Sequence, residues 1–337
     1  MNLSDIRTAP WALTPTKFAE VLAIYERHER GETADLEAIA ARIGKPLANT
    51  RQPLTVDANG VAHISVDGVT GRRMNALQDI SGGTSTQVLS SEIARAVADE
   101  NITGIILHID SPGGEVAGMQ ELAGQVFAAR GTKPIEALVD GMCCSAAYWL
   151  ASACDAIRLS SDSTAVGSIG VIGSHTDTSG AEAARGVRTT TVASGPLKGA
   201  PSPHAPLDAT GRSVLQAAVD HHHGIFAGDV SKHRGLEGDR LKAVTDGRVL
   251  YGKAAVDAGL ADSVGDRVPA MVERFRRSSS IAQKRPRSDV VIRDPAPPRS
   301  VGDISTAAAA LVAREARAGR HLQVAQAIAL VTSGQGI

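Results

Sequence analysis

Residues 103–131 read TGIILHIDSPGGEVAGMQELAGQVFAARG, and the order of residue types in this stretch decides the fold class. TGIILHID is an almost continuous apolar run, which is typical of a strand buried on both faces of a sheet. GGEVAGMQELAGQVFAARG predicts a helix that ends at Gly131. The turn DSPGG (110–114) therefore joins a buried strand to the start of a helix.

The same alternation continues on both sides of this stretch. A succession of strands and helices predicts an α/β fold with a largely parallel sheet and right-handed crossovers. We expect further strands at 61–66, 133–141, 156–160 and 187–193, and further helices at 90–100, 143–155, 180–185 and 207–233.

Shifts in composition divide the chain into four segments. Residues 1–50 predict an N-terminal segment of two short helices, and residues 51–277 form the main domain. Residues 278–303 are polar, basic and proline-rich, which predicts a disordered linker. Residues 304–337 are rich in alanine and predict a helical but flexible C-terminal tail.

Composition also excludes several classes of protein. The 337 residues carry 35 basic and 36 acidic side chains, a formal net charge of −1, so no nucleic-acid-binding field is expected. Three clustered cysteines, Cys143, Cys144 and Cys154, are too few for a disulfide framework, and no metal-ligand spacing is present. The sequence shows neither a signal peptide nor a membrane span. We therefore expect a soluble, cytoplasmic protein without metal or cofactor.

Two glycine-containing turns carry candidate catalytic groups. In DSPGG (110–114), the glycines let backbone N–H groups approach a ligand, and such groups stabilise a developing oxyanion. In GMCCSAA (141–147), Ser145 follows a strand and opens a helix, where the helix dipole favours a negatively charged oxygen. Each turn also has a purely structural reading, because glycine eases tight turns and serine often caps helices.

A candidate base follows in the loop GPLKG (195–199). Lys198 accepts a proton only in its neutral form, which burial favours, whereas a lysine in such a loop is usually a solvated charge. Ser168, in VGSIGV (166–171), has a hydroxyl that could orient this amine.

Together these elements resemble a known family. From about Gly104 to Val264, the order strand–DSPGG–helix, GxxxSAAY turn, VGSIGV and lysine-containing loop is similar to that of the signal peptide peptidase A family of serine peptidases. The resemblance implies a ClpP/crotonase-like fold with repeated ββα units. It also implies polypeptide substrates and a homo-oligomeric ring.

The resemblance assigns a role to each candidate residue. Ser145 would be the nucleophile, Lys198 the general base of a Ser-Lys dyad, and Ser168 the residue that orients the lysine. The backbone N–H groups of Gly114 and Ala146 would form the oxyanion hole. No metal or cofactor takes part in that mechanism.

The segment PWALTPTKFAEVLAIYERHERGE (10–32) resembles the leader of the phage and prophage branch of this family, the capsid or head maturation proteases. This second resemblance implies phage portal, scaffold or capsid proteins as partners or substrates. It places the chain in the host cytoplasm or in a procapsid.

Several other readings stay open. A cytosolic enzyme of the same family would degrade peptides instead. A ClpP-like Ser-His-Asp triad would use His175 or His204, and a cysteine peptidase would use Cys143 or Cys144. A crotonase-like enzyme acting on acyl-CoA esters and a non-catalytic capsid-assembly protein also share the fold. The histidines at 221–223 are expected to form a solvated helix face.

Overall fold

Strands β6 (Gly104–Ser111) and β8 (Ile135–Cys144) form the centre of the main sheet in a computed structural model of the chain. The structure describes residues 10–14, 16, 18, 19, 21–23, 30, 54–72 and 83–284. β6 is buried along most of its length because it has a strand on each side and side chains packed on both faces. The buried strand predicted from TGIILHID is therefore present.

The main sheet runs in the order β11-β10-β8-β6-β3-β2, with β9 paired to β8 and β12 paired to β9. Its core strands β3, β6, β8 and β10 are parallel, as the sequence predicts. The remaining strands are β2 (Thr55–Val56), β3 (Val61–Asp67), β9 (Ala156–Leu159), β10 (Ala165–Gly167), β11 (Val249–Tyr251) and β12 (Ser263–Val264).

A second, smaller sheet has the order β1-β7-β4-β5. β7 pairs in parallel with β4, whereas β1 pairs with β7 in antiparallel orientation. These strands are β1 (Trp11–Leu13), β4 (Val69–Gly71), β5 (Gly83–Ser85) and β7 (Gly113–Glu115). The α/β class with ββα units is confirmed, because the pairs β3–β4 and β6–β7 each lead on to a helix.

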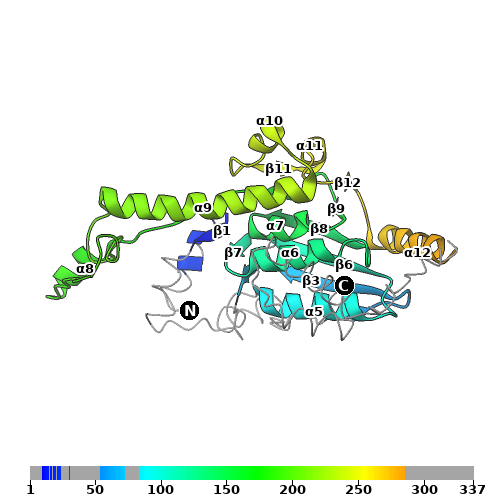
Figure 1. Ribbon diagram of the computed structural model, residues 1–337, viewed down its shortest axis with the longest axis horizontal. Helices are drawn as coiled ribbons and strands as arrows, with labels where there is room; N and C mark the ends of the chain where they lie inside the picture. The colour runs from blue at the N-terminus through cyan, green and yellow to red at the C-terminus, as the bar shows by residue number, and fades with distance from the viewer. Residues whose placement is uncertain are drawn as a thin grey trace, which may run out of the picture. The chain divides into compact units, whose positions relative to one another are not determined.

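Helices cover both faces of the main sheet. On one face α5 (Thr86–Ala98), α6 (Met119–Ala129) and α7 (Ala146–Ser152) pack in sequence, and α9 (Ala209–Arg234) crosses α7 (Figure 1). On the other face, α12 (Val268–Lys284) packs Met271 and Phe275 against Val61 and Ile106. The shorter helices are α8 (Ser179–Ala184), α10 (Gly238–Lys242) and α11 (Gly252–Asp257).

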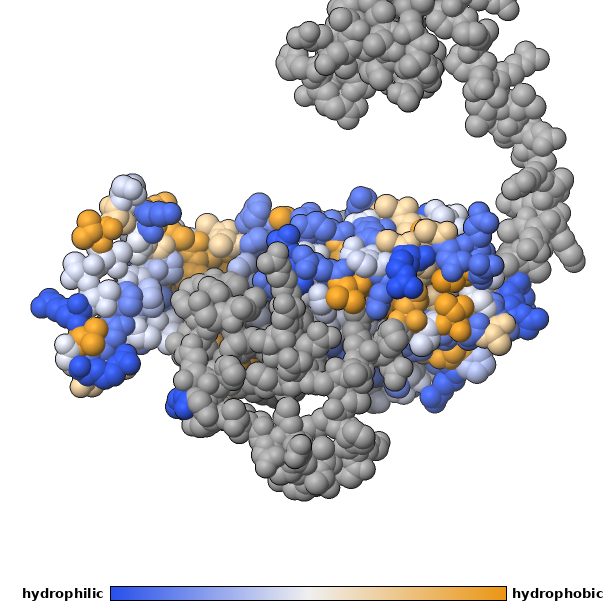
Figure 2. Space-filling model, turned by 90° about the horizontal axis from the view of Figure 1, so that it is seen from below, coloured by the Kyte–Doolittle hydropathy of each residue, from blue (hydrophilic) through white to orange (hydrophobic). Residues whose placement is uncertain are grey.

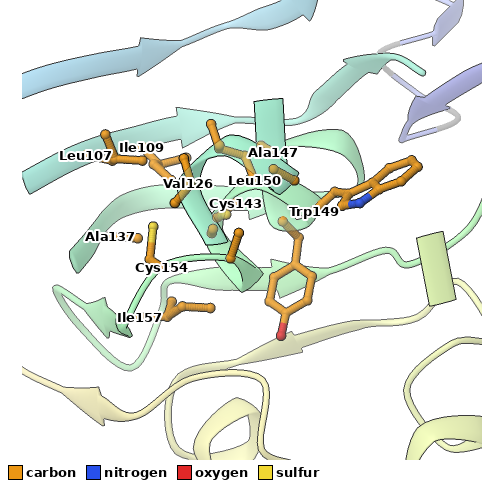
Figure 3. Packing of buried hydrophobic residues seen from close by; sticks show 14 of the residues in the cluster. Leu107, Ile109, Val126, Ala137, Cys143, Ala147, Trp149, Leu150, Cys154 and Ile157 are labelled. Carbon is orange, nitrogen blue, oxygen red and sulfur yellow. The ribbon is translucent and has the colours of Figure 1, made fainter. Parts of the chain in front are cut away.

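The core between the sheet and α7 is built from small and aliphatic side chains. Figure 3 shows Cys143 and Cys154 among such residues from β6, β8 and α6. α7 is buried at every position, so the short helix that begins next to Ser145 is held on all sides. Arg130 fixes its other end by donating hydrogen bonds to the carbonyls of Ser152, Ala153 and Cys154.

The C-terminal half of α9 is anchored on α7. The rings of Trp149 and Phe226 stack with their centroids 4.6 Å apart, and the indole N–H of Trp149 donates to Asp229 at 2.8 Å. The N-terminal half of α9 projects away from the sheet together with α8 (Figure 1). We call residues 172–210, which include α8 and lead into α9, the arm; no residue of this segment is buried.

Two predictions about local structure were wrong. The segment 187–193 is an exposed loop in the arm and forms no strand, because no neighbouring strand edge is there to pair with it. Gly113 does not begin a helix, because residues 113–115 form β7 and the helix starts only at Met119. The alternation of the sequence could not reveal this intervening strand.

The structure describes the N-terminal and C-terminal segments only in part. Residues 16, 18, 19 and 21–23 are helical, as predicted, but the strand β1 before them was not predicted. The second predicted N-terminal helix and the tail at 304–337 lie outside the described residues. α12 continues to Lys284, into the segment predicted as a linker. Within the described part, no helix has the length and apolar character needed to cross a membrane.

The environment of His233 predicts how stability depends on pH. Its ring stacks on Phe127, and its Nδ1 lies 3.0 Å from the Ser152 hydroxyl. Burial, with smaller effects from the charges around it, lowers the pKa of His233 from 6.5 to about 4. Between these values the unfolded chain binds more protons, so stability is complete above about pH 6.5 and falls as the pH drops toward 4.

We expect the free energy of unfolding to fall more between pH 7 and pH 4 in the wild type than in His233→Gln, by on the order of 3 kcal/mol. Urea unfolding at a series of pH values measures this difference. His223→Gln, a change on the same helix, serves as the control. Parallel curves for the wild type and His233→Gln would contradict the prediction.

Candidate active site

Ser145 lies at a sharp turn between β8, which ends at Cys144, and α7, which begins at Ala146. Its φ of 55° and ψ of −119° are unusual for a residue with a side chain. Two hydrogen bonds hold this conformation: the Ser145 N–H donates to the Gly167 carbonyl at 2.7 Å, and the Ser145 carbonyl accepts from the Trp149 N–H at 2.9 Å. Backbone strain of this kind is concentrated at functional sites.

Ser168 is the other non-glycine residue with positive φ in the described part of the chain, with φ of 51°. It follows Gly167, which pairs with Cys144 across the neighbouring parallel strands β10 and β8. The Ser168 N–H donates to the Arg248 carbonyl at 2.7 Å. The sheet register thus brings Ser145 and Ser168 to adjacent positions, although they are far apart in the sequence.

The glycine turn lies directly against Ser145. Gly113 has φ of 107°, and a Cβ atom added to it would lie 2.9 Å from the Cβ of Ser145. Ser111 supports the turn, because its hydroxyl donates to the Gly68 carbonyl at 2.6 Å and accepts from the Gly113 N–H at 3.2 Å. Glycine is therefore needed at position 113 because other parts of the chain come close to its backbone, as the sequence suggests. It is not needed to begin a helix.

The two predicted oxyanion-hole residues flank this contact. Ala146 follows Ser145 at the first position of α7, a helix end without a side-chain cap. Gly114 follows Gly113 in β7, where an added Cβ atom would lie 1.8 Å from the Thr70 carbonyl oxygen. The backbones of both residues are therefore close to Ser145, and only glycine fits at 114.

Ser145 is 1% exposed, and its hydroxyl donates a long hydrogen bond of 3.4 Å to the Gly170 carbonyl. The thiols of Cys143 and Cys144, the two residues before Ser145, are poorer candidates for a nucleophile. Cys143 is fully buried, and burial raises its pKa well above the ordinary value, while the pKa of Cys144 is raised to about 11. Since the thiolate is the reactive form, neither cysteine is suited to act as a nucleophile.

Lys198 does not meet Ser145 within the described part of the chain. It is an exposed residue of the arm, in the loop between α8 and α9 (Figure 1). Neither Ser145 nor Ser168 forms a hydrogen bond with it among the described residues. The predicted dyad is thus divided between the core and the arm.

The histidines considered as alternative bases are also in the arm. The Nε2 atom of His175 lies 2.8 Å from the Ser202 carbonyl oxygen, and the Nδ1 atom of His204 lies 2.7 Å from a carboxylate oxygen of Glu182. Both rings therefore have partners in the arm itself. In the described residues, no group of three or more His, Cys, Asp and Glu side chains could hold a metal ion.

Comparison with known proteins decides the family. Residues 128–277, which include Ser145, Ser168 and Lys198, match the model of peptidase family S49. A protein of Synechocystis sp. called slr0021 is 30% identical over 193 residues, which cover 57% of this chain and 69% of that protein. The chain belongs to peptidase family S49. This confirms the resemblance found in the sequence and, with it, the expected fold; the family is one of peptidases.

Two phage proteins are also similar to this chain. The "Head-tail preconnector protein GP5" of Enterobacteria phage P21 is 34% identical over 232 residues, 68% of this chain and 46% of that protein. The "Capsid assembly protease C" of Escherichia phage lambda is 38% identical over 208 residues, 61% of this chain and 46% of that protein. The matched region thus spans less than half of each phage protein.

Sequence reasoning missed the strand β1, which reaches this site from the N-terminus. The carbonyl oxygen of Ala12 lies 2.3 Å from the point where a Gly113 Cβ would be, the same point that is 2.9 Å from the Cβ of Ser145. The apolar triplet Trp11-Ala12-Leu13 was the available signal, but three residues are too few to predict a strand.

The close contact of Gly113 yields a prediction. Gly113→Ala should abolish activity and lower the free energy of unfolding by about 1–3 kcal/mol, because its φ is positive and the new methyl group would overlap backbone atoms. Gly124→Ala is the matched control, since this glycine of α6 has open space around it. It should keep activity and gain about 0.5–1 kcal/mol. Peptide-cleavage assays and urea unfolding measure both effects.

Proposed function

We propose that this chain is a serine endopeptidase in which Ser145 is the nucleophile and Lys198 the general base. The observation that carries the proposal is the strained turn of Ser145, with the Gly113 backbone packed against its Cβ atom. A nucleophile needs this combination of a fixed side chain and nearby backbone donors. The family match and the burial of the neighbouring thiols support the choice of serine.

The mechanism is acyl transfer. The neutral amine of Lys198 takes the proton of the Ser145 hydroxyl as the oxygen attacks a peptide carbonyl carbon. The N–H groups of Gly114 and Ala146 stabilise the oxyanion, and the lysine gives its proton to the leaving amine as the C–N bond breaks. A water molecule then hydrolyses the acyl-enzyme with the same proton transfers. Ser168 orients the amine, and no cofactor takes part.

The lysine comes from a second copy of the chain. Lys198 belongs to the arm, in which no residue is buried, and Val192 there is 93% exposed. Figure 2 shows hydrophobic residues (orange) on the arm, at the left of the view. An exposed arm with hydrophobic side chains gains stability when it packs on a neighbouring copy of the chain. When the same head-to-tail contact repeats from copy to copy, the copies close into a ring. Each site then combines Ser145 of one copy with Lys198 of the next.

The two phage relatives suggest the substrate class. One is named as a capsid assembly protease and the other as a head-tail preconnector protein. We therefore place this chain's substrates among phage portal, scaffold or capsid proteins, with cleavage in the procapsid or the host cytoplasm. The second candidate is a peptide-degrading enzyme of the same family. Faster cleavage of purified scaffold than of unfolded proteins such as casein would favour the first candidate, and equal rates would favour the second.

Single substitutions test the catalytic assignment. Ser145→Ala and Lys198→Ala should each lower the rate of cleavage of labelled casein by about 10²–10⁴-fold, the range that a nucleophile or general base supplies. His175→Ala and Lys253→Ala, which change an arm histidine and an exposed lysine, should leave the rate unchanged. Full activity of Lys198→Ala would contradict lysine as the base. Loss of activity in His175→Ala would favour a histidine-based mechanism instead.

Mixing two inactive variants tests whether the lysine is shared. When Ser145→Ala and Lys198→Ala chains are dissociated, mixed and reassembled, about a quarter of the sites should regain both groups if neighbours supply the lysine in a ring. Each variant taken through the same procedure alone should stay inactive. A mixture that remains as inactive as its components would show that one chain supplies both residues.

The proposed base also predicts a pH profile. Only the neutral amine accepts the proton of Ser145, so kcat/KM should rise with pH between about pH 5 and 9. The Lys253→Ala control should have the same profile as the wild type. A flat profile over this range, measured with labelled casein, would contradict lysine as the base.

A further inference from the structure

The N-terminal strand β1 fills a gap between two backbone edges at the active site. On one side Trp11, Ala12 and Leu13 pair with Glu115, Gly114 and Gly113. On the other side, Trp11 and Ile172 exchange two hydrogen bonds: the Trp11 N–H donates to the Ile172 carbonyl at 3.0 Å, and the Ile172 N–H donates to the Trp11 carbonyl at 2.8 Å. These edges can bind any extended peptide in the same way, because the contacts involve the backbone.

The strand crosses the site at the nucleophile. Gly113, whose backbone contacts the Ala12 carbonyl oxygen, is the residue packed against Ser145. Ile172 lies two residues after Gly170, which accepts the hydrogen bond of the Ser145 hydroxyl. Ser145 itself is 1% exposed. A protein substrate that binds these two edges as an extended strand must displace β1.

Packing on both sides of the strand holds it in place. Trp11 and Leu13 are buried in a small cluster with Phe18, Val21 and Val69, separate from the main core. The rings of Trp11 and Phe18 lie 5.9 Å apart. Ala12 belongs instead to the main core cluster and is fully buried. The strand thus turns a small side chain toward the main core, and the large apolar side chains of Trp11 and Leu13 face the other way.

We propose that Pro10–Thr14 competes with substrate for the strand-binding site at Ser145, and that activity requires this segment to leave. The proposal rests on the proposed peptidase function and adds its regulation. Phe18 and Val21, which follow the strand, pack in the same cluster as Trp11 and Leu13. They therefore keep the segment near the site, where it can compete with substrate. The sequence of the strand also describes the expected substrate: an extended segment with a small residue between large apolar ones.

Loosening the strand should raise activity. We expect Trp11→Ala to increase kcat/KM for labelled casein by at least about tenfold, because loss of a buried aromatic ring weakens the packing that holds the segment. Val56→Ala, at an exposed apolar position of β2, is the matched control and should change nothing. The hexapeptide Ala-Pro-Trp-Ala-Leu-Thr, residues 9–14, should inhibit Trp11→Ala competitively. An unchanged kcat/KM, or no inhibition, would overturn the proposal.

A second measurement does not depend on peptidase activity. In chains that carry Ser145→Cys, the introduced thiol should react with iodoacetamide at least about tenfold faster when Trp11→Ala or Ala12→Asp is also present, because opening of the strand controls access. Mass spectrometry separates this thiol from the buried cysteines, and circular dichroism verifies folding. Equal rates would overturn the proposal. Faster alkylation without casein cleavage in any variant would leave the strand's role standing and reject the peptidase function.

One more outcome bears on the strand. If the wild type, but not Ser145→Ala, loses residues 1–12 on incubation, then the segment is a substrate that is removed and not a competitor that returns. Intact mass spectrometry measures this directly. We expect the mass of the wild type to stay unchanged.

Discussion

The hydrogen bond from the Ser145 N–H to the Gly167 carbonyl is the contact on which the site depends. It joins the ends of β8 and β10 at the point where β8 turns into α7, and it keeps Ser145 at positive φ. Because the two strands are in register at Cys144 and Gly167, the residue that follows each strand is a serine with positive φ. The parallel pairing of two strands thus places both serines.

The core stabilises this turn from behind. α7 is buried throughout, Arg130 binds the carbonyls at its end, and the stack of Trp149 on Phe226 ties it to α9. The same stack fixes the base of the arm, because Phe226 lies in the half of α9 that packs on the core. The contacts of α7, the helix that follows Ser145, therefore help to fix the base of the arm. Lys198 lies farther along the arm, in the loop between α8 and α9.

Local sequence patterns predicted the elements that form by local rules. The apolar run at 103–110 became β6, the pattern at 90–100 became part of α5, and the turn at Ser145 lies between a strand and a helix as expected. The short strands β1 and β7 could not be predicted, since each exists only through pairing with a distant segment. The place of Lys198 in the fold was hidden for a related reason: the sequence contains no sign that the loop around it lies in an arm outside the core.

The pairing of Trp11 with Glu115 and Ile172 has a consequence for the order of events during synthesis. Trp11 leaves the ribosome before both partners, and Ile172 is made only after β3, β6, β8 and α7. Closing so long a loop is entropically costly and slow, so β1 docks once β7 and Ile172 are in place. A strand that is made before its partners is thus among the last elements to find its place, and it lies beside Ser145 as soon as the site exists. A newly made chain would then be protected from premature chemistry by a strand of its own.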